Sequence, residues 1–292
     1  MCIRILIHRQ PRSALLRDNS DMDSVSRGVP QDCRRWWEDR IHRAQDLQVP
    51  HPNVRDLLRF YQEVLQFQLE LAENSNSAVR SGVSLREQID PTIAVRRFPR
   101  LLALASESGL EPLSRHGHVL MEAGEDHWRH ILESALAADR DDSNFLNSFF
   151  ARVCLQPAAE NLQSQVPIDE GYGQSICPIC GGVPQLSVLR PEGEGAARWL
   201  LCSFCLREWR FRRIACPWCA EEDKEKLPRY SADAYTYVHL EACDRCKRYL
   251  KNVDMTIEGR AVPLVDEIAM AVLDVWASDH GYTKIVPNLI GF

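Results

Sequence analysis

Residues 177–182 read Cys-Pro-Ile-Cys-Gly-Gly, and the same Cys-x-x-Cys spacing recurs three times before residue 247. Eight of the 11 cysteines of the chain belong to these four pairs, whereas chance would give well under about one such pair. Two thiolates at this spacing can bind one metal ion when the backbone between them turns tightly, as in zinc ribbons. We therefore expect the metal ligands to be Cys177, Cys180, Cys202, Cys205, Cys216, Cys219, Cys243 and Cys246.

The spacing between the pairs predicts which cysteines share a metal ion. The first two pairs are separated by 21 residues and the last two by 23, which leaves room for a hairpin in each interval. Only ten residues separate the second pair from the third. Sequential pairing therefore predicts a first four-cysteine ribbon at 175–214 and a second at 215–255. Interleaved pairing, of the first pair with the third and the second with the fourth, remains open because spacing alone does not determine connectivity.

The donor set indicates two metal ions, each zinc or iron. Four thiolates in a tetrahedron suit Zn²⁺ and a rubredoxin-like iron alike. In the simplest interpretation both ions replace a hydrophobic core that a ribbon of this size lacks. The alternative is a redox or sulfur-handling role, which requires exposed and activated thiolates.

The residues before the cysteines have the periodicity of helices. Apolar residues recur at three- and four-residue steps, for example at Leu58, Tyr61 and Leu65. This pattern predicts a helical domain of about six helices at 30–163. The segment 164–174 lacks the periodicity and contains proline and glycine, so we expect it to be a linker.

Short strand-like runs follow the linker, and an amphipathic stripe lies near the end of the chain. The runs lie at 185–189, 198–201, 208–214 and 235–240. The stripe extends from Val265 to Trp276 and predicts a C-terminal helix, followed by a tail, within 256–292. The predicted fold class is therefore α+β. It comprises an N-terminal α-helical domain, tandem rubredoxin-like or zinc-ribbon four-cysteine modules, and a C-terminal helix.

Composition and the N-terminal sequence bear on location. A chain of 292 residues with 45% hydrophobic and 26% charged residues fits a globular protein of about two domains. No apolar run approaches the ~20 residues of a membrane span. Arg4 and His8 interrupt the apolar stretch that a signal peptide would need. We therefore expect a cytoplasmic protein whose residues 1–29 form a polar, flexible tail, and a reducing compartment favours metal binding over disulfides.

The charge distribution argues against a nucleic-acid partner. Residues 1–170 have a net charge of −5 and residues 171–292 of −1, so neither half is strongly basic. Four thiolates around a divalent ion add a local charge of about −2, which disfavours anionic partners further. Residues 207–213 nevertheless alternate arginines with Trp209 and Phe211, as in single-strand binders. A nucleic-acid or transcription-type zinc ribbon is therefore the alternative function, and a strand with its aromatic residues buried is the structural explanation of the same pattern.

Several segments resemble those of one known family. They are Cys-Pro-Ile-Cys-Gly-Gly-Val-Pro at 177–184, Cys-Ser-Phe-Cys-Leu-Arg-Glu-Trp at 202–209, Cys-Pro-Trp-Cys at 216–219 and Cys-Asp-Arg-Cys-Lys-Arg-Tyr-Leu-Lys at 243–251. Phe149–Pro157 and the stretch from Asp266 to Asp274 are also similar. On these residues the chain resembles the formate dehydrogenase accessory protein family, FdhE, over roughly residues 30 to 282.

This resemblance implies a function. It implies a cytoplasmic maturation factor, not an enzyme, that acts on the catalytic molybdopterin subunit of a respiratory formate dehydrogenase before export. It also implies rubredoxin-like metal sites with iron as a native metal, and no particular oligomeric state. The spacing of the residues gives no catalytic nucleophile and no phosphate-binding loop. A rubredoxin-like electron carrier is a third hypothesis.

Overall fold

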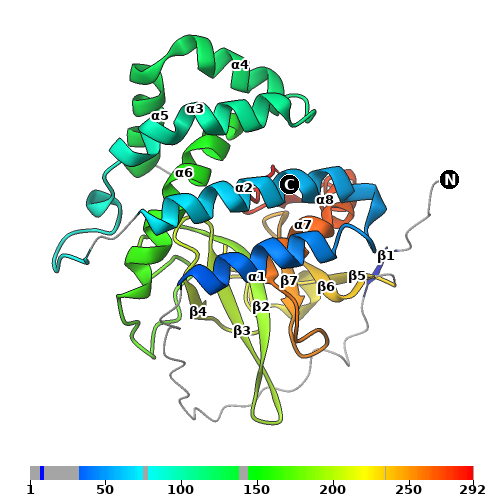
Figure 1. Cartoon of the computed structure of the whole chain (residues 1–292). Helices are drawn as coiled ribbons and strands as arrows, with labels where there is room; N and C mark the ends of the chain where they lie inside the picture. Colours follow the sequence, from blue (N-terminus) through cyan, green and yellow to red (C-terminus); the bar gives the residue numbers. More distant parts are fainter. Residues whose placement is uncertain (1–6, 10–32, 75–77, 138–143, 234, 292) are drawn as a thin grey trace.

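The computed structural model describes residues 7–9, 33–74, 78–137, 144–233 and 235–291, without the side chain of Cys33. Within these residues, helices form the N-terminal half and a mixed sheet with two further helices forms the C-terminal half (Figure 1). The α+β fold class predicted from the sequence is confirmed.

Six α-helices lie in the described part of the N-terminal half. They are α1 (Cys33–Asp46), α2 (Arg55–Glu73), α3 (Thr92–Glu107), α4 (Leu113–Ala123), α5 (Glu125–Ala137) and α6 (Phe145–Ser164). Short 3-10 turns, η2 (Pro52–Val54) and η3 (Arg86–Gln88), precede α2 and α3. Along α2, the buried residues Leu58, Leu65 and Leu71 follow the helical period that the sequence predicts.

Helix α6 connects the helical half with the cysteine-containing half. Most of its residues are buried on every face, which is typical of a helix surrounded by other elements. The side chain of Asn144 accepts a hydrogen bond from the backbone N–H of Asn147 at 3.2 Å and begins the helix. Arg152 and Gln156 both donate to the carbonyl of Ser203, at 3.0 and 2.9 Å, in the second Cys-x-x-Cys turn. The first cysteine hairpin is thereby fixed to the centre of the helical half.

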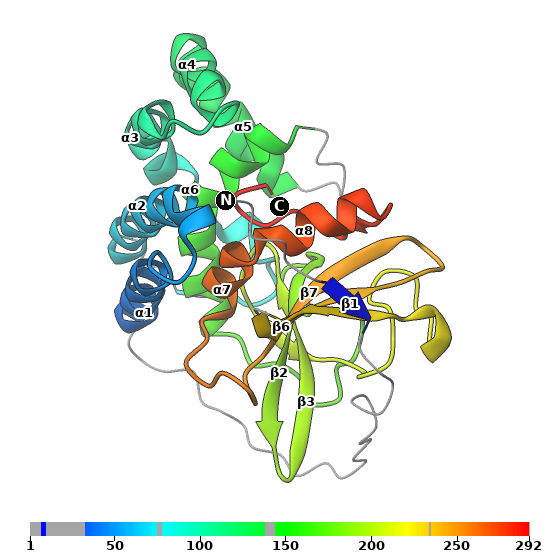
Figure 2. The same ribbon diagram turned by 90° about the vertical axis from the view of Figure 1, so that its right-hand side faces the viewer.

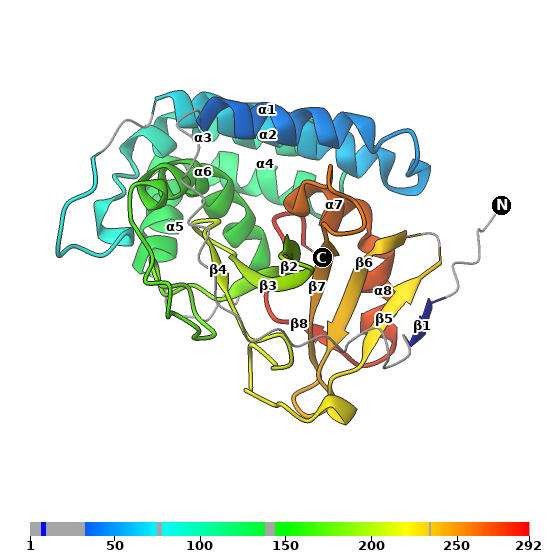
Figure 3. The same cartoon turned by 90° about the horizontal axis from the view of Figure 1, so that it is seen from below.

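The described strands form one eight-stranded sheet of order β1-β5-β6-β7-β2-β3-β4, with β8 paired to β7 (Figure 3). They are β1 (Ile7–Arg9), β2 (Pro184–Glu192), β3 (Gly195–Cys202), β4 (Glu208–Arg210), β5 (Arg229–Ala232), β6 (Tyr235–Ala242), β7 (Arg248–Asp254) and β8 (Thr283–Lys284); the 3-10 turn η4 (Lys224–Lys226) precedes β5. Strand β1 lies within residues 1–29, for which the sequence predicts a polar tail, and the rest of that segment lies outside the described residues.

The two cysteine hairpins share this sheet. Hairpin β2–β3 lies between the first and second cysteine pairs, and hairpin β5–β6 lies between the third and fourth. Strand β2 pairs in parallel with β7, from Leu186↔Lys251 to Leu189↔Asp254. This pairing joins the strands of the two four-cysteine segments along one continuous hydrogen-bonded ladder.

Two short helices, α7 (Pro263–Ala269) and α8 (Ala271–Asp279), pack against β6 and β7 (Figure 2). The sequence predicts one continuous helix here, and the structure interrupts it at Met270. The interruption has a physical reason. The carbonyl of Glu267, at the end of α7, accepts a hydrogen bond at 2.5 Å from the buried ammonium of Lys251.

Buried ion pairs hold these helices to the rest of the molecule. Arg43 of α1 pairs with Asp266 of α7 at 2.5 Å, and the carboxylate is fully buried. Beneath α8, Asp274 contacts the ammonium groups of Lys251 and Lys284, whose side chains are also buried. Removal of one member of such a group leaves an uncompensated buried charge, so each member is needed.

The substitution Asp274→Asn should therefore lower the free energy of unfolding by about 3 kcal/mol, because it leaves two buried ammonium groups without their shared carboxylate. Asp279→Asn, on the exposed end of the same helix, should change it by less than about 0.5 kcal/mol. Urea denaturation of both variants measures the difference. Equal effects would show that the buried group contributes no more than surface charge.

The same carboxylate gives a pH dependence of known sign. Burial acts to raise the pKa of Asp274, but Lys251 and Lys284 outweigh it, so the pKa lies below its usual value. Stability from this group is present at neutral pH and is lost as the pH falls through the acid range. Asp274→Asn should accordingly show a flatter decline of stability between neutral and acid pH than the parent chain.

Candidate metal centres

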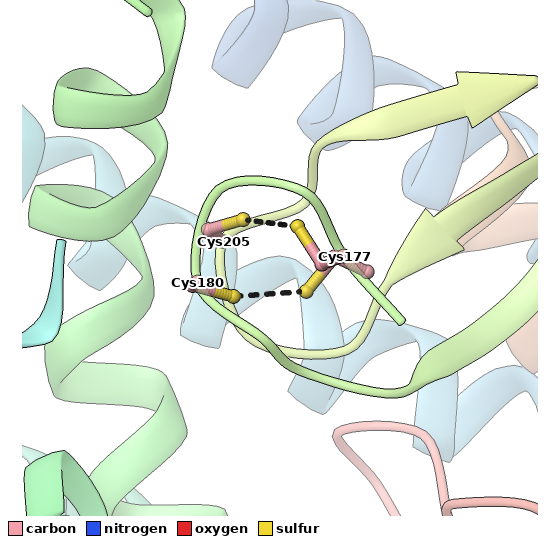
Figure 4. A group of neighbouring side chains, drawn as sticks. Cys177, Cys180 and Cys205 are labelled. Carbon is pink, nitrogen blue, oxygen red and sulfur yellow. Dashed lines mark hydrogen bonds between the residues drawn. The ribbon is translucent and has the colours of Figure 1, made fainter. Parts of the chain in front are cut away.

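The first four-cysteine group lies where two loops of the sheet meet. Cys177 and Cys180 belong to the loop before β2, Cys202 ends β3, and Cys205 follows in the turn toward β4. The Sγ atoms of Cys177 and Cys205 are 3.5 Å apart and those of Cys180 and Cys202 are 3.4 Å apart. Figure 4 shows the labelled Cys177, Cys180 and Cys205 turned toward a common centre.

The second group repeats this arrangement at the other hairpin. The Sγ atoms of Cys216 and Cys246 are 3.8 Å apart, and those of Cys219 and Cys243 are 3.6 Å apart. In each group all four sulfurs lie within 4.8 Å of one another. The structure thus brings the cysteines together in the sequential grouping, and not in the interleaved one.

These distances suit a bound ion better than disulfides. A tetrahedral ion with metal–sulfur bonds of about 2.3 Å places its sulfurs about 3.8 Å apart. A disulfide would bring two sulfurs to about 2.05 Å. Each group offers four soft sulfur donors and could hold Zn²⁺ or iron, and nothing in the donor set selects one of these metals.

Each Cys-x-x-Cys turn, called a knuckle below, has the same backbone shape. The N–H of the first cysteine donates to the carbonyl five residues later in all four knuckles, at 2.8 to 2.9 Å. The residue after the second cysteine has a positive φ in every case: 70° at Gly181, 58° at Leu206, 58° at Ala220 and 56° at Lys247. The last three lack the conformational freedom of glycine, so each accepts a cost of about 1–2 kcal/mol to close its knuckle.

Gly182 is needed for a different reason, because it lies against the sulfurs. A Cβ atom at this position would be 3.0 Å from Sγ of Cys202 and 3.2 Å from Sγ of Cys180. The backbone N–H groups of Ile179 and Phe204 also point at sulfurs, at 3.5 Å from Cys177 and 3.4 Å from Cys202. Amide N–H groups so placed stabilise thiolates.

The metal-free thiols of the first group have opposed acidities. Burial raises the pKa of Cys202 and of Cys205 well above the usual value, because a desolvated thiolate is costly. Hydrogen bonds from Cys177, Cys202 and Cys205 lower the pKa of Cys180. Four thiolates at this spacing would repel one another, so a cation is the partner that allows all four to ionise together.

The surroundings of the two groups differ. The helical half covers the first group: the Arg86 guanidinium lies 4.0 Å from the ring of Phe204 and donates to the carbonyl of Cys180 at 3.4 Å. Of the second group, Cys219 and Cys246 are only half-buried. Trp218, between the cysteines of the third knuckle, is 40% exposed. The first centre is therefore internal and the second is accessible.

The arginine-rich segment 207–213 is largely occupied by internal contacts. Trp209 and Phe211 are buried, and β4 ends at Arg210, which forms a bidentate pair with Glu192 at 2.7 and 2.8 Å. Arg212 pairs with Glu222. The aromatic residues therefore cannot stack on bases, and this pattern reflects the core of the sheet.

The cysteines outside the pairs take no part in either group. Cys154 is buried in α6, and burial raises the pKa of its thiol. It serves as a small core residue, as the helical periodicity predicts. Cys2 lies outside the described residues, and the side chain of Cys33 is not described.

Two family models match adjacent stretches of the chain. "FdhE, central domain" matches residues 176–213, which contain the first group, and "FdhE, C-terminal domain" matches residues 214–290, which contain the second. From residue 176 onward the chain is similar to the FdhE family. The resemblance predicted from the cysteine motifs is thus confirmed.

Individual relatives extend the similarity to the helical half. The FdhE homologue of Aquifex aeolicus is 25% identical over 271 residues, which cover 86% of this chain and 94% of the relative. The homologue of Stutzerimonas stutzeri is 31% identical over 122 residues, 41% of this chain and 40% of its own. The crystal structure of the FdhE protein from Pseudomonas aeruginosa has the same fold, with a TM-score of 0.60 at 22% identity, over 89% of this chain and 97% of that one. Among the described helices none is long and apolar enough to cross a membrane.

Replacement of one sulfur should empty one centre only. Cys177→Ser removes a candidate ligand of the first group, so the metal content should fall from two ions per chain to one, measured by elemental analysis. Cys154→Ser, a buried cysteine outside both groups, should retain both ions. Loss of both ions from Cys177→Ser would contradict independent centres and indicate that the continuous sheet makes them one cooperative unit.

A methyl group at Gly182 should disturb the first centre. We expect Gly182→Ala to weaken metal binding there by about tenfold or more, because its Cβ would crowd two sulfurs. Gly173→Ala, whose Cβ would meet no atom within 4 Å, is the control. Competition with a chromogenic chelator measures the affinity, and equal affinities in the two variants would refute the crowding.

Proposed function

We propose that this protein is an accessory factor for the maturation of a respiratory formate dehydrogenase and binds its catalytic subunit in the cytoplasm. Similarity to the FdhE family in both four-cysteine segments, and in a relative matched over 86% of this chain, is the observation that carries this proposal. The protein acts by binding and not by catalysis, because its chemically distinctive residues are eight cysteines in two closed groups. Four protein ligands leave no open position for a substrate.

The eight cysteines hold two ions, zinc or iron, whose first task is structural. Each ion would hold a pair of knuckles together and fix the ends of one hairpin. Closure of the knuckles requires positive φ at three residues other than glycine, which is costly in an unsupported loop. The metal–sulfur bonds offset this cost.

The second centre is the part of the site that meets the catalytic subunit. The first centre is covered by α6 and by Arg86, whereas the third knuckle presents Trp218 at the surface. The guanidinium of Arg248 lies 4.0 Å from the centre of the Trp218 ring and holds the indole in place. An exposed aromatic residue on a rigid knuckle is typical of an interface anchor.

The test is to purify the tagged protein from its host, grown anaerobically with formate, and to identify what co-purifies by mass spectrometry. The catalytic subunit of a formate dehydrogenase should be recovered with the parent chain. Trp218→Ala should reduce its recovery by about tenfold, the usual loss for an aromatic anchor. Val119→Ala, which changes a still more exposed apolar residue on α4, should leave recovery unchanged.

Two outcomes would contradict the proposal. Recovery of nucleic acid or RNA polymerase without a dehydrogenase would favour a transcription-type ribbon. Recovery of the dehydrogenase that is equal in Trp218→Ala and lost in Val119→Ala would move the interface to the helical half. The variants Cys177→Ser and Cys216→Ser then separate the contribution of the first centre from that of the second.

A rubredoxin-like electron carrier is the second candidate, favoured by the half-buried Cys219 and Cys246. Electron transfer requires a redox-active ion near the surface, and the second centre alone has this position. Iron absorbance with a reversible one-electron step would support this function. Native protein loaded only with zinc would exclude it.

A further inference from the structure

A cleft of about 70 Å³ lies beside the second four-cysteine group. Cys216 and Cys243 form part of its wall. Its charged lining consists of Arg198, Arg213, Lys224, Arg229, Arg248 and a single carboxylate, Glu241. The cysteine motifs do not predict this cleft, because Arg198, Arg229 and Arg248 come from strands far apart in the chain.

The strand pairing brings these arginines to one face of the sheet. Lys251 points toward α7, where it donates to the carbonyl of Glu267. Because side chains alternate along a strand, Arg248 of β7 lies on the opposite face. Arg229 of β5 is the register partner of Glu241 on β6, and Glu241 in turn accepts a hydrogen bond from Arg198 of β3 at 2.6 Å.

Two of the buried arginines have unused hydrogen-bond donors. The residues Arg198 and Arg229 are 4% and 8% exposed, and the Nε of each has no hydrogen-bond partner among the described residues. Arg229 makes only long contacts, at 3.4 Å to Asn252 and 3.7 Å to Asp254. Arg198 is already held by Glu241 at 2.6 Å, so Arg229 is the arginine whose donors are left without a short hydrogen bond.

The cleft also has a surplus of positive charge. Its lining has five cationic side chains and one carboxylate, and Asp254 pairs with Arg229 from outside the lining, which leaves three charges uncompensated. Burial lowers the pKa of Arg229, and the neighbouring Arg213 and Arg198 lower it further against the opposing effect of Glu241 and Asp254. Four thiolates with a divalent ion would contribute about −2. A surplus of about +1 remains, in a chain whose formal net charge is −6.

We propose that this cleft binds a phosphoryl group, either as free phosphate or as the ester of a small organic molecule. A phosphate carries about −1.5 to −2 at pH 7 and is attracted by the positive charge that remains. The cleft has room for several water molecules and therefore for one phosphate group. Arginine forks bind phosphate oxygens through paired N–H groups. Apolar residues, among them Leu227, Pro228 and Ile285, also line the cleft and suit the organic part of an ester.

The test uses the metal-loaded, full-length protein in calorimetric titrations at low ionic strength. The probes are inorganic phosphate, phenyl phosphate and benzoate. Both phosphates should bind, and benzoate should bind at least about tenfold more weakly because it carries one charge and two oxygens. Tighter binding of phenyl phosphate would identify an ester as the ligand, and equal binding would identify free phosphate. The proposal fails if neither phosphate binds, because the arginines would then only balance the charge of the metal centre. It also fails if benzoate binds as tightly.

Matched variants localise the binding. Arg213→Gln and Lys224→Gln each remove one charge from the cleft and should weaken phosphate binding by about tenfold. Arg212→Gln is the control, because Arg212 is adjacent in sequence but exposed and paired with Glu222 outside the cleft. Equal weakening in all three variants would overturn the proposal by showing diffuse attraction. Metal content, measured in parallel, shows that the second centre is intact. The titrations use isolated protein, so their outcome does not depend on the proposed dehydrogenase partner.

Discussion

The parallel pairing of β2 with β7 is the constraint on which the rest of the molecule depends. Each hairpin alone has too little apolar surface to fold, and a metal ion can fix only its ends. The ladder from Leu186↔Lys251 to Leu189↔Asp254 places the two hairpins side by side and gives them a common core. It also places Lys251 where it meets α7 and α8 on one face, while Arg248 lies on the other. Core, buried ion group and cleft therefore follow from a single register.

The sequence predicted the candidate site in more detail than the fold. Cysteine spacing is short-range information, and the sulfur grouping follows from the hairpin lengths between the pairs. The first helices were predictable because α2 and its neighbours each bury one face. By contrast, β5 and β7 were not predicted, since their partners lie elsewhere in the chain and buried polar residues such as Asn252 conceal the strand pattern. The break at Met270 depends on Lys251, about twenty residues earlier, and no local signal marks it.

Features that depend on distant contacts leave no local signal in the sequence. For this reason positive φ was foreseeable at Gly181 but not at Leu206 or Lys247. Glycine indicates this conformation, whereas a leucine or lysine that adopts it under tertiary constraint leaves no mark in the sequence. The arginines of the cleft were missed for a related reason. Residues 198, 229 and 248 are neighbours only after β3, β5 and β7 have paired with their partners in one sheet. The net charge of each half of the chain argued against anionic partners. A net charge does not show that several cationic side chains lie together in one cleft.

The different burial of the two cysteine groups implies an order of metal acquisition. In the first group only Cys180 is half-buried, and Arg86 of the helical half covers it, so an ion reaches this centre more readily before the helices close over it. The second centre, with Cys219 and Cys246 half-buried and no described helix over them, can exchange its ion more readily after folding is complete. The first ion would then be fixed for the lifetime of the molecule. The second would exchange with the metal available in its surroundings. The metal in the first site would then reflect availability during synthesis, and the metal in the second would reflect current availability.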